Sequence, residues 1–370
     1  MMSSSVVLTQ VDLPVNPSRP RNFTIILGSN NQVSQGETTP PHRASRAVGT
    51  CSPIGRKIAN PISLEKDLTD SAILLSKTIP RWFENVQNYD GGIPSDAQGS
   101  PNCGWVTAGA IWATASVSQT SPEWLDRALA WLLANTNPDG GIPIYSRGSD
   151  SLTDATAHAL LALQLLGGHY DASAALSQSL VATQKHDGPW SWRATDATPS
   201  TCSTVFAVLA LAVRSTVDAT LDAKGEKAAQ WLRSIQHPDG SVPLTTGAIG
   251  TPASTGLALI VYKLLGADQA RAAARDHLLQ TRAKRAWPIV IERPSGHTIL
   301  RNSNAYALLG LLYDADEPSR PRICSSLRRY FESVQAASVG LEAAPGTRTW
   351  PTRDLLLVAA MSLANQDRLL

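Results

Sequence analysis

The 370-residue sequence has few charged residues, few cysteines and no long apolar run, and each shortage excludes a class of protein. Charged residues make up 17% and the formal net charge is +2, so the strong basic field of a nucleic-acid-binding protein is absent. The four cysteines lie far apart without a Cys-x-x-Cys pair, which disfavours a disulfide framework and indicates a reducing compartment. No apolar run approaches the ~20 residues that cross a bilayer, which leaves peripheral membrane contact as the alternative. By contrast, ten tryptophans outnumber seven tyrosines and four phenylalanines, and 43% apolar residues indicate a large buried interior.

The beginning of the chain differs in composition from the rest. Its first sixty residues are rich in Ser, Pro, Thr and Asn, and their only acidic residues are Asp12 and Glu37. We expect residues 1–67 to form a disordered N-terminal tail and residues 68–370 to form one folded domain. We expect a cytoplasmic protein, with organelle targeting by this Ser- and Arg-rich, acid-poor tail as the alternative.

From about residue 68 the chain repeats a unit of roughly fifty residues. Four copies contain a similar turn, and its aspartate recurs after 49, 48 and 52 residues: VQNYDGGIP (86–94), NTNPDGGIP (135–143), TQKHDGPWS (183–191) and IQHPDGSVP (235–243). An amphipathic helix is predicted before each turn: 71–87, 122–136, 172–184 and 224–236. A small-residue, mostly apolar helix is predicted after each turn: 105–117, 153–166, 201–214 and 253–265. Two degenerate copies follow, with helix pairs near 267–282 and 302–313, and near 319–336 and 353–365.

The two helix types predict a two-layer all-α fold. The first type has a charged face for solvent, whereas the second is apolar on nearly every side, as expected for helices enclosed by neighbours. Six such hairpins can close into an (α/α)6 barrel. An open solenoid of the same hairpins is the structural alternative.

The repeat resembles that of the prenyltransferase and squalene-oxidase repeat superfamily, which includes squalene-hopene cyclases, class II diterpene cyclases and protein prenyltransferase β-subunits. Gln87, Gln184 and Gln236 precede their aspartates by three residues, and TAHALLAL (156–163) matches the apolar helix of that repeat. The resemblance covers about 68–366 and implies a barrel whose apolar helices begin around one mouth. Aligning these helices predicts a first layer of residues at the mouth: Trp105, Asp154, Cys202, Ala253, Asn302 and Asp354. It predicts a second layer one turn deeper: Gly109, His158, Phe206, Leu257, Tyr306 and Val358.

The resemblance also implies a chemistry. Class II cyclases protonate an alkene or epoxide with the middle aspartate of a DxDD motif, and LTDATA (152–157) places Asp154 at that position. Burial would keep this carboxyl protonated, and π-faces would stabilise the cation. His158, four residues later on the same helix face, could orient the acid or return its proton, and Asp354 is the second candidate carboxylate. The candidate substrate-binding residues near the mouth are Trp105, Trp112, Trp190, Trp192, Phe206, Asn302, Tyr306 and Trp350. Each of these residues also has a non-catalytic alternative. Asp154 could be a first-turn carboxylate stabilised by the helix dipole, His158 could be a structural histidine, and the tryptophans could only pack in the core.

Two features depart from the cyclase pattern. Leu152 and Ala155 replace the flanking aspartates, and the chain has one barrel where class II cyclases usually place the site between two. The zinc site of a prenyltransferase is not expected, because only Cys202 of its three ligands is present. Several basic residues could bind a diphosphate, or could be solvated loop charges: Arg193, Lys284, Arg285, Arg293, Arg301 and Arg353.

The resemblance predicts a terpene cyclase-like enzyme, an isomerase or lyase, that acts on a linear isoprenoid by proton-initiated cyclisation. No cofactor or metal is expected, and Mg²⁺ would be needed only with a diphosphate substrate. One alternative is a non-catalytic barrel that binds an apolar ligand or a partner protein. Another is a carbohydrate-acting barrel in which Asp154 and Asp354 lie ~5 to 10 Å apart as paired carboxylates.

Overall fold

The computed structural model describes residues 61–96, 100–118, 122–145, 147–214, 219–282, 287, 290–293, 296–299, 303–316, 318–336 and 350–365. The predicted tail lies outside these ranges up to residue 60. Helix α1 (Pro61–Val86) begins before the expected boundary at 68.

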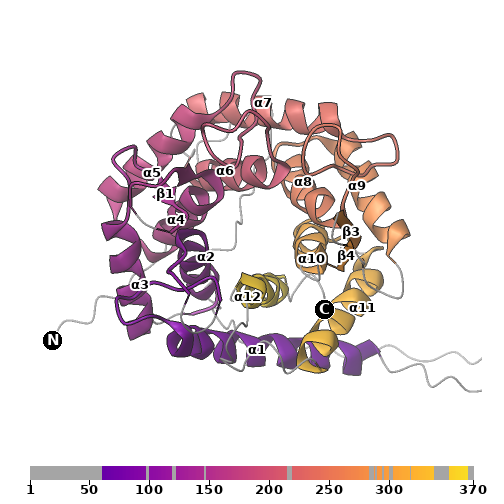
Figure 1. Cartoon of the computed structure of the whole chain (residues 1–370). Coiled ribbons are helices and arrows are strands. Elements are labelled where there is room, and N and C mark those ends of the chain that lie inside the picture. The colour runs from indigo at the N-terminus through magenta and orange to yellow at the C-terminus, as the bar shows by residue number, and fades with distance from the viewer. Residues whose placement is uncertain are drawn as a thin grey trace, which may run out of the picture.

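The described helices form two concentric rings (Figure 1). The outer ring consists of α1, α3 (Glu123–Ala134), α5 (Tyr170–Thr183), α7 (Ala219–Ile235), α9 (Asp268–Thr281) and α11 (Arg320–Ala336). The inner ring consists of α2 (Gly104–Ala115), α4 (Thr153–Leu166), α6 (Thr201–Arg214), α8 (Pro252–Leu264), α10 (Ser303–Tyr313) and α12 (Trp350–Ala364). Two short hairpins complete the described elements: β1 (Ile142–Pro143) with β2 (Ser151–Leu152), and β3 (Val290–Arg293) with β4 (Gly296–Ile299). The predicted (α/α)6 barrel is confirmed.

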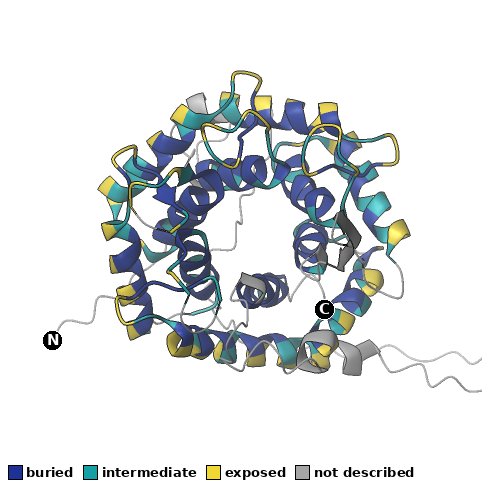
Figure 2. Cartoon of the chain, in the orientation of Figure 1, coloured by how far each residue is buried: buried dark blue, intermediate teal, exposed yellow. Residues whose placement is uncertain are grey.

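The inner and outer helices differ in how far they are buried. Inner helices are buried almost throughout, whereas outer helices expose only their outward faces (Figure 2). Trp82, Trp131 and Trp231, near the ends of three outer helices, are 3%, 9% and 7% exposed and belong to the hydrophobic core. No described helix is both long and apolar enough to cross a bilayer.

The sixth inner helix closes the ring. Helix α12 packs against α2, α1 and α10, and α11 packs against α1. The first and last repeats therefore share an interface, as the cartoon also shows (Figure 1). The alternative of an open solenoid is wrong.

The repeated turn joins each hairpin to the next. Gln87 Nε2 donates hydrogen bonds to the Gly91 carbonyl (2.7 Å) and to the Trp124 carbonyl on the next outer helix (2.8 Å). Gln184 and Gln236 make the same pair of bonds in their repeats. The glycine after each aspartate has a positive φ and lies against the next outer helix, where a side chain would collide with backbone atoms.

A threonine fixes the start of each of four inner helices. The hydroxyls of Thr107, Thr156, Thr204 and Thr255 accept hydrogen bonds, 2.9 to 3.0 Å long, from backbone N–H groups that follow the preceding turn. Because Asp154 comes two residues before Thr156, this bond also fixes where the acid lies relative to the mouth.

Candidate active site

A cavity lies at one end of the barrel, where α4 and α6 begin. This mouth cavity has a volume of about 560 Å³ and is lined by Asp154, Trp192, Asp196, Ala197, Thr198, Ser200, Cys202, Leu244 and Thr245. Asp154 is the second residue of α4 and is only 8% exposed, whereas Trp192 is 45% exposed at the rim. The predicted acid therefore lines a hollow at the mouth and is not turned to bulk solvent.

The environment of Asp154 favours its protonated form. Oδ1 is buried and has no hydrogen-bond partner among the described residues. Burial raises the pKa of this carboxyl to about 6, against the smaller opposing effects of the Ser203 hydroxyl and the Arg353 charge. A carboxyl with this pKa holds a proton for part of the time near neutral pH and can deliver it to a substrate.

His158 lies one turn deeper, among aromatic rings. Its ring centroid is 4.5 Å from Phe206, 5.2 Å from Trp112 and 6.5 Å from Trp105. The side chain is fully buried, and neither ring nitrogen has a partner among the described residues. Burial, and then the Arg353 charge, hold the pKa of His158 well below its usual value. The imidazole is therefore neutral and has a nitrogen lone pair that can accept a proton.

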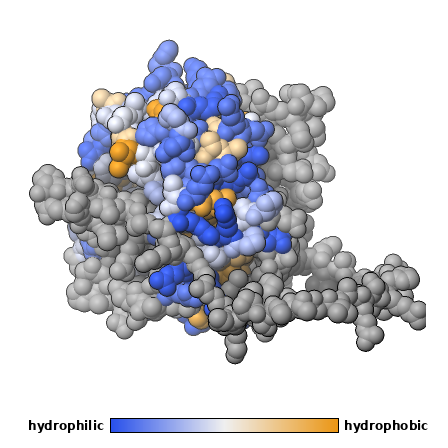
Figure 3. Space-filling view, turned by 90° about the vertical axis from the view of Figure 1, so that its right-hand side faces the viewer, coloured by the Kyte–Doolittle hydropathy of each residue, from blue (hydrophilic) through white to orange (hydrophobic). Residues whose placement is uncertain are grey.

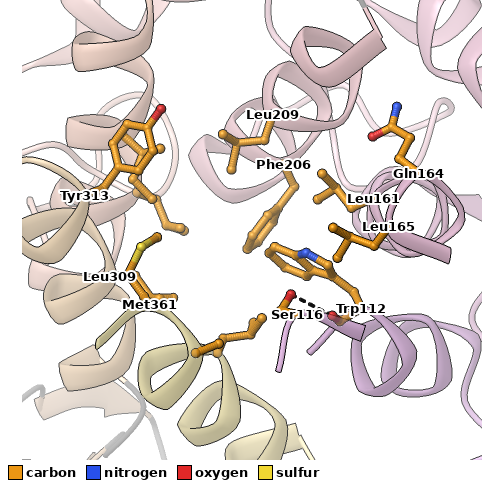
Figure 4. Close-up of a pocket in the computed structure, with 14 residues that line it drawn as sticks. Trp112, Ser116, Leu161, Gln164, Leu165, Phe206, Leu209, Leu309, Tyr313 and Met361 are labelled. Atoms are coloured by element: carbon orange, nitrogen blue, oxygen red, sulfur yellow. Dashed lines mark hydrogen bonds between the residues drawn. The ribbon is translucent and has the colours of Figure 1, made fainter. Parts of the chain in front are cut away.

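A second, apolar cavity lies beyond this aromatic layer. It encloses about 70 Å³ and is lined by Trp112, Ser116, Leu161, Gln164, Leu165, Phe206, Leu209, Leu257, Ile260, Leu309, Tyr313, Leu357, Ala360 and Met361 (Figure 4). Two of its polar groups are hydrogen-bonded to backbone: Ser116 Oγ donates to the Trp112 carbonyl (2.8 Å) and Gln164 Nε2 to the Ala210 carbonyl (3.1 Å). Gln164 Oε1 is buried and has no hydrogen-bond partner among the described residues. Leu161 is seven residues from Asp154 on α4, so the cavity begins roughly 10 Å along the helix from the acid. This lining suits a hydrocarbon chain.

The register predicted for the sixth inner helix is wrong. Trp105, Asp154, Cys202 and Ala253 are second residues of their helices, but Asp354 is the fifth residue of α12. Asp354 Oδ1 accepts hydrogen bonds from Arg353 (2.6 Å) and from the second-layer Tyr306 hydroxyl (3.3 Å). Asp354 therefore belongs to the deeper layer, and Val358 does not correspond to His158. The helix starts at Trp350, whose side chain lies outside the described residues, and the degenerate sixth repeat has no turn motif to set the register.

Arg353 is the functional candidate that sequence reasoning misjudged most. The sequence leaves it as a diphosphate ligand or a solvated loop charge, yet its side chain is fully buried and its guanidinium carbon lies 4.2 Å from the ring centroid of Trp105. At least part of the π-surface of Trp105 therefore already faces a protein cation. The available signal was the Arg-Asp pair within the apolar run of α12.

The remaining predicted site residues divide into three groups. Trp190 is buried, donates from Nε1 to the Leu180 carbonyl (2.7 Å) and lines neither cavity, so it packs between layers. Arg193 lies at the mouth, where its guanidinium carbon is 5.6 Å from the ring centroid of Trp192. Its Nη1 is 3.9 Å from Asp150 Oδ2. Arg301 and Asn302 lie outside the described residues. In the described part of the chain no three His, Cys, Asp or Glu side chains come together as a metal site.

Fold and site together define an α/α barrel with a buried acid at its mouth and an apolar chamber behind it. The profile of the family "Prenyltransferase alpha-alpha toroid domain" matches residues 55–143 and 145–283, more than half of the chain. The chain belongs to this family.

Known proteins are similar to the chain over different lengths. A drimenyl diphosphate synthase from Streptomyces showdoensis is 34% identical over 167 residues, 42% of this chain and 29% of that protein. The chain thus spans less than a third of that relative. Among solved structures, the apo type II terpene cyclase MstE from Scytonema has a TM-score of 0.57 at 13% identity, covering 82% of this chain and 99% of that one. The α-1,6-mannanase GH76A from Salegentibacter sp. HEL1_6 has a TM-score of 0.58 at 11% identity, and the match covers 80% of this chain and 99% of the mannanase. Both likenesses show the fold alone.

Proposed function

We propose that this protein is a class II terpene cyclase-like enzyme that protonates and cyclises a linear isoprenoid. The observation that carries the proposal is Asp154, a buried carboxyl with a raised pKa that lines the mouth of an apolar, aromatic barrel. An alkene is a very weak base, so its proton donor must stay protonated in a dry site.

The site residues account for each step of such a reaction. Asp154 transfers its proton to one carbon of the terminal double bond, and the electron pair of that bond forms the new C–H bond. The other carbon becomes a cation, which a second double bond of the same chain attacks to close a ring. The faces of Trp112 and Phe206 stabilise the moving positive charge. A final C–H proton is lost, and neutral His158 is the nearest base in the second layer.

The relatives support this choice of chemistry. The Streptomyces relative is named for a diphosphate product, which supports an isoprenoid diphosphate as one substrate class. The Scytonema cyclase has been solved with geranylgeranyl dihydroxybenzoate as substrate, which supports an isoprenoid without a diphosphate as another. That cyclase is also covered over 99% of its length, so one barrel is long enough for a type II cyclase. We propose no metal cofactor, except Mg²⁺ where the substrate is a diphosphate, and a cytoplasmic location.

The apolar cavity also supports the second candidate, a barrel that binds an apolar ligand without converting it. The glycosidase alternative is disfavoured, because the Asp354 carboxylate is already held by Arg353 and Tyr306.

Product analysis separates these functions. The purified protein is incubated with farnesyl diphosphate, geranylgeranyl diphosphate and squalene, and the products are analysed by gas chromatography after dephosphorylation. We expect a cyclic product from the wild type, none from Asp154→Asn, and an unchanged product from Asp171→Asn, which alters an exposed carboxylate at the start of the outer helix α5. Retention of an isoprenoid without any product would instead favour the binding protein.

A further inference from the structure

Arg353 is held rigidly inside the barrel by residues from three inner helices. Its Nη2 donates to Asp354 Oδ1 (2.6 Å) and to the Tyr306 hydroxyl (3.0 Å), and its Nε donates to Asp354 Oδ1 (2.9 Å). The guanidinium lies over Trp105 of α2. On the same helix, Gly109 leaves the space that the arginine occupies, because a Cβ there would collide with Arg353 Cδ and Nη1.

This arrangement leaves part of the guanidinium unpaired. Nη1 is buried and has no hydrogen-bond partner among the described residues. A buried N–H donor without an acceptor is costly, so an acceptor close to Nη1 at some stage of function would remove this cost. Asp154 lies at the start of α4, which packs against α2, the helix of Trp105. Its Oδ1 is also buried without a hydrogen-bond partner among the described residues.

We propose that Arg353 is a positioning residue whose buried guanidinium stabilises the carboxylate that Asp154 becomes when it donates its proton. This inference rests on the proposed function for its catalytic meaning, but the electrostatic contact can be measured without turnover. The acid comes from the second repeat and its counter-charge from the sixth.

The other groups around Asp154 do not supply this charge. Cys202 on α6 and Tyr306 on α10 are kept neutral, because burial raises the pKa of each. His158 on α4 is neutral, and Ser203 offers only a hydroxyl. Two carboxylates remain, Asp354 on α12, which partly offsets Arg353, and Asp196 in the loop that lines the mouth. The other cation at the mouth, Arg193, is 39% exposed, and its Nη1 lies 3.9 Å from Asp150 Oδ2. Among the described groups, Arg353 is therefore the cation that acts on the acid.

Two substitutions should move the acidity of Asp154 in opposite directions. The carboxyl carbon of Asp154 is followed by ¹³C NMR in a pH titration, and the signal is assigned by its loss in Asp154→Asn. In Arg353→Met the cation is gone, so the pKa of Asp154 should rise by about one unit or more. In Asp354→Asn the cation loses its counter-charge, so the pKa of Asp154 should fall. Arg353→Lys should restore a value between those of the wild type and Arg353→Met.

A purely structural role for Arg353 would give a different result. Loss of packing would shift the pKa of Asp154 in the same direction in both variants, or leave it unchanged, and either outcome overturns the proposal. If Arg353→Met does not fold, the double variant Arg353→Met/Asp354→Asn removes the pair together and should still raise the pKa of Asp154. If the titrations behave as expected but no isoprenoid is converted, the proposed function fails while the electrostatic contact stands.

Discussion

At the scale of single residues, the chemistry depends on burial. Asp154 and His158 are ordinary titratable residues one helical turn apart, and the dry interior shifts both towards their neutral forms. An acid that still holds its proton and a base without one can therefore coexist at about pH 6. The pair fits a reaction that begins by giving a proton and ends by recovering one.

The first prediction concerns the pH dependence of turnover. The active form of Asp154 is protonated, and its pKa is raised to about 6. We expect kcat/KM for an isoprenoid to fall about tenfold per pH unit above about pH 6 and to level off below it. A steady-state profile measures this, and a rate that rises with pH through this range would contradict the assignment.

The second prediction concerns stability. Because the folded-state pKa of Asp154 lies above its usual value, its contribution to stability is present at low pH and is lost as the pH rises through about 6. The Asp154→Asn variant, which cannot ionise, should therefore gain on the order of 2 kcal/mol relative to wild type between about pH 4 and about pH 8. Urea unfolding at both pH values measures the difference. The substitution Asp239→Asn is the control: the hydrogen bond from the Ser241 backbone N–H lowers the pKa of Asp239, so this variant should gain no stability over this range.

Sequence predicts these residues unevenly. Asp154, His158 and Phe206 could be found because the turn and the threonine of their repeats fix the helix start. For Asp354 the sequence predicts a position about a turn too shallow, and for Arg353 it leaves a diphosphate ligand and a loop charge open, because the sixth repeat has no such turn. The pairing of Arg353 with Tyr306 and Trp105 joins repeats far apart in the chain, and no local pattern predicts it.

At the scale of helices, the position of the second-layer side chains depends on how closely neighbouring inner helices pack. Helices α8 and α10 pack through Gly256 and Gly310, and a Cβ on either would collide with backbone atoms of the other helix. Tyr306, which binds Arg353 and Asp354, is on α10 beside this contact. Two glycines in the inner ring thus set where the Tyr306 hydroxyl lies.

The third prediction tests this contact. Gly256→Ala should force α8 and α10 apart and destabilise the protein by about 1 to 3 kcal/mol, because the obstructing atoms are backbone. Gly225→Ala on the outer helix α7 is the matched control, because its Cβ would meet only ordinary contacts and alanine favours helix. Chemical denaturation of both variants checks this, and equal midpoints would contradict it.

At the scale of the whole molecule, the surface and the interior are strongly segregated. The side of the barrel in Figure 3 is largely hydrophilic where the structure describes it, with scattered apolar side chains. Apolar residues instead gather between the rings and around the inner chamber. The sequence predicted this division well, because the amphipathic and apolar helices alternate along the chain.

The fourth prediction concerns ring closure. Helix α12 covers flanks of α1, α2 and α10, so a chain that ends after Ala336 should expose their apolar faces. We expect this truncated chain to bind the dye ANS strongly and to unfold with a broader transition than the full chain. Deletion of residues 1–54, ahead of the family match, is the control and should leave both properties near wild type. A sharp transition without dye binding in the truncated chain would show that five hairpins suffice.

The position of Arg353 has a consequence for the order of events during refolding. Asp154 and Arg353 are 199 residues apart in the chain, and Arg353 takes its place in the barrel only when α12 packs against α1 and α2. Helicity can return hairpin by hairpin, whereas the polarised acid cannot exist in a partly assembled chain. In a refolding experiment the circular dichroism signal should therefore recover before turnover does, and the delay between them would time the last docking step.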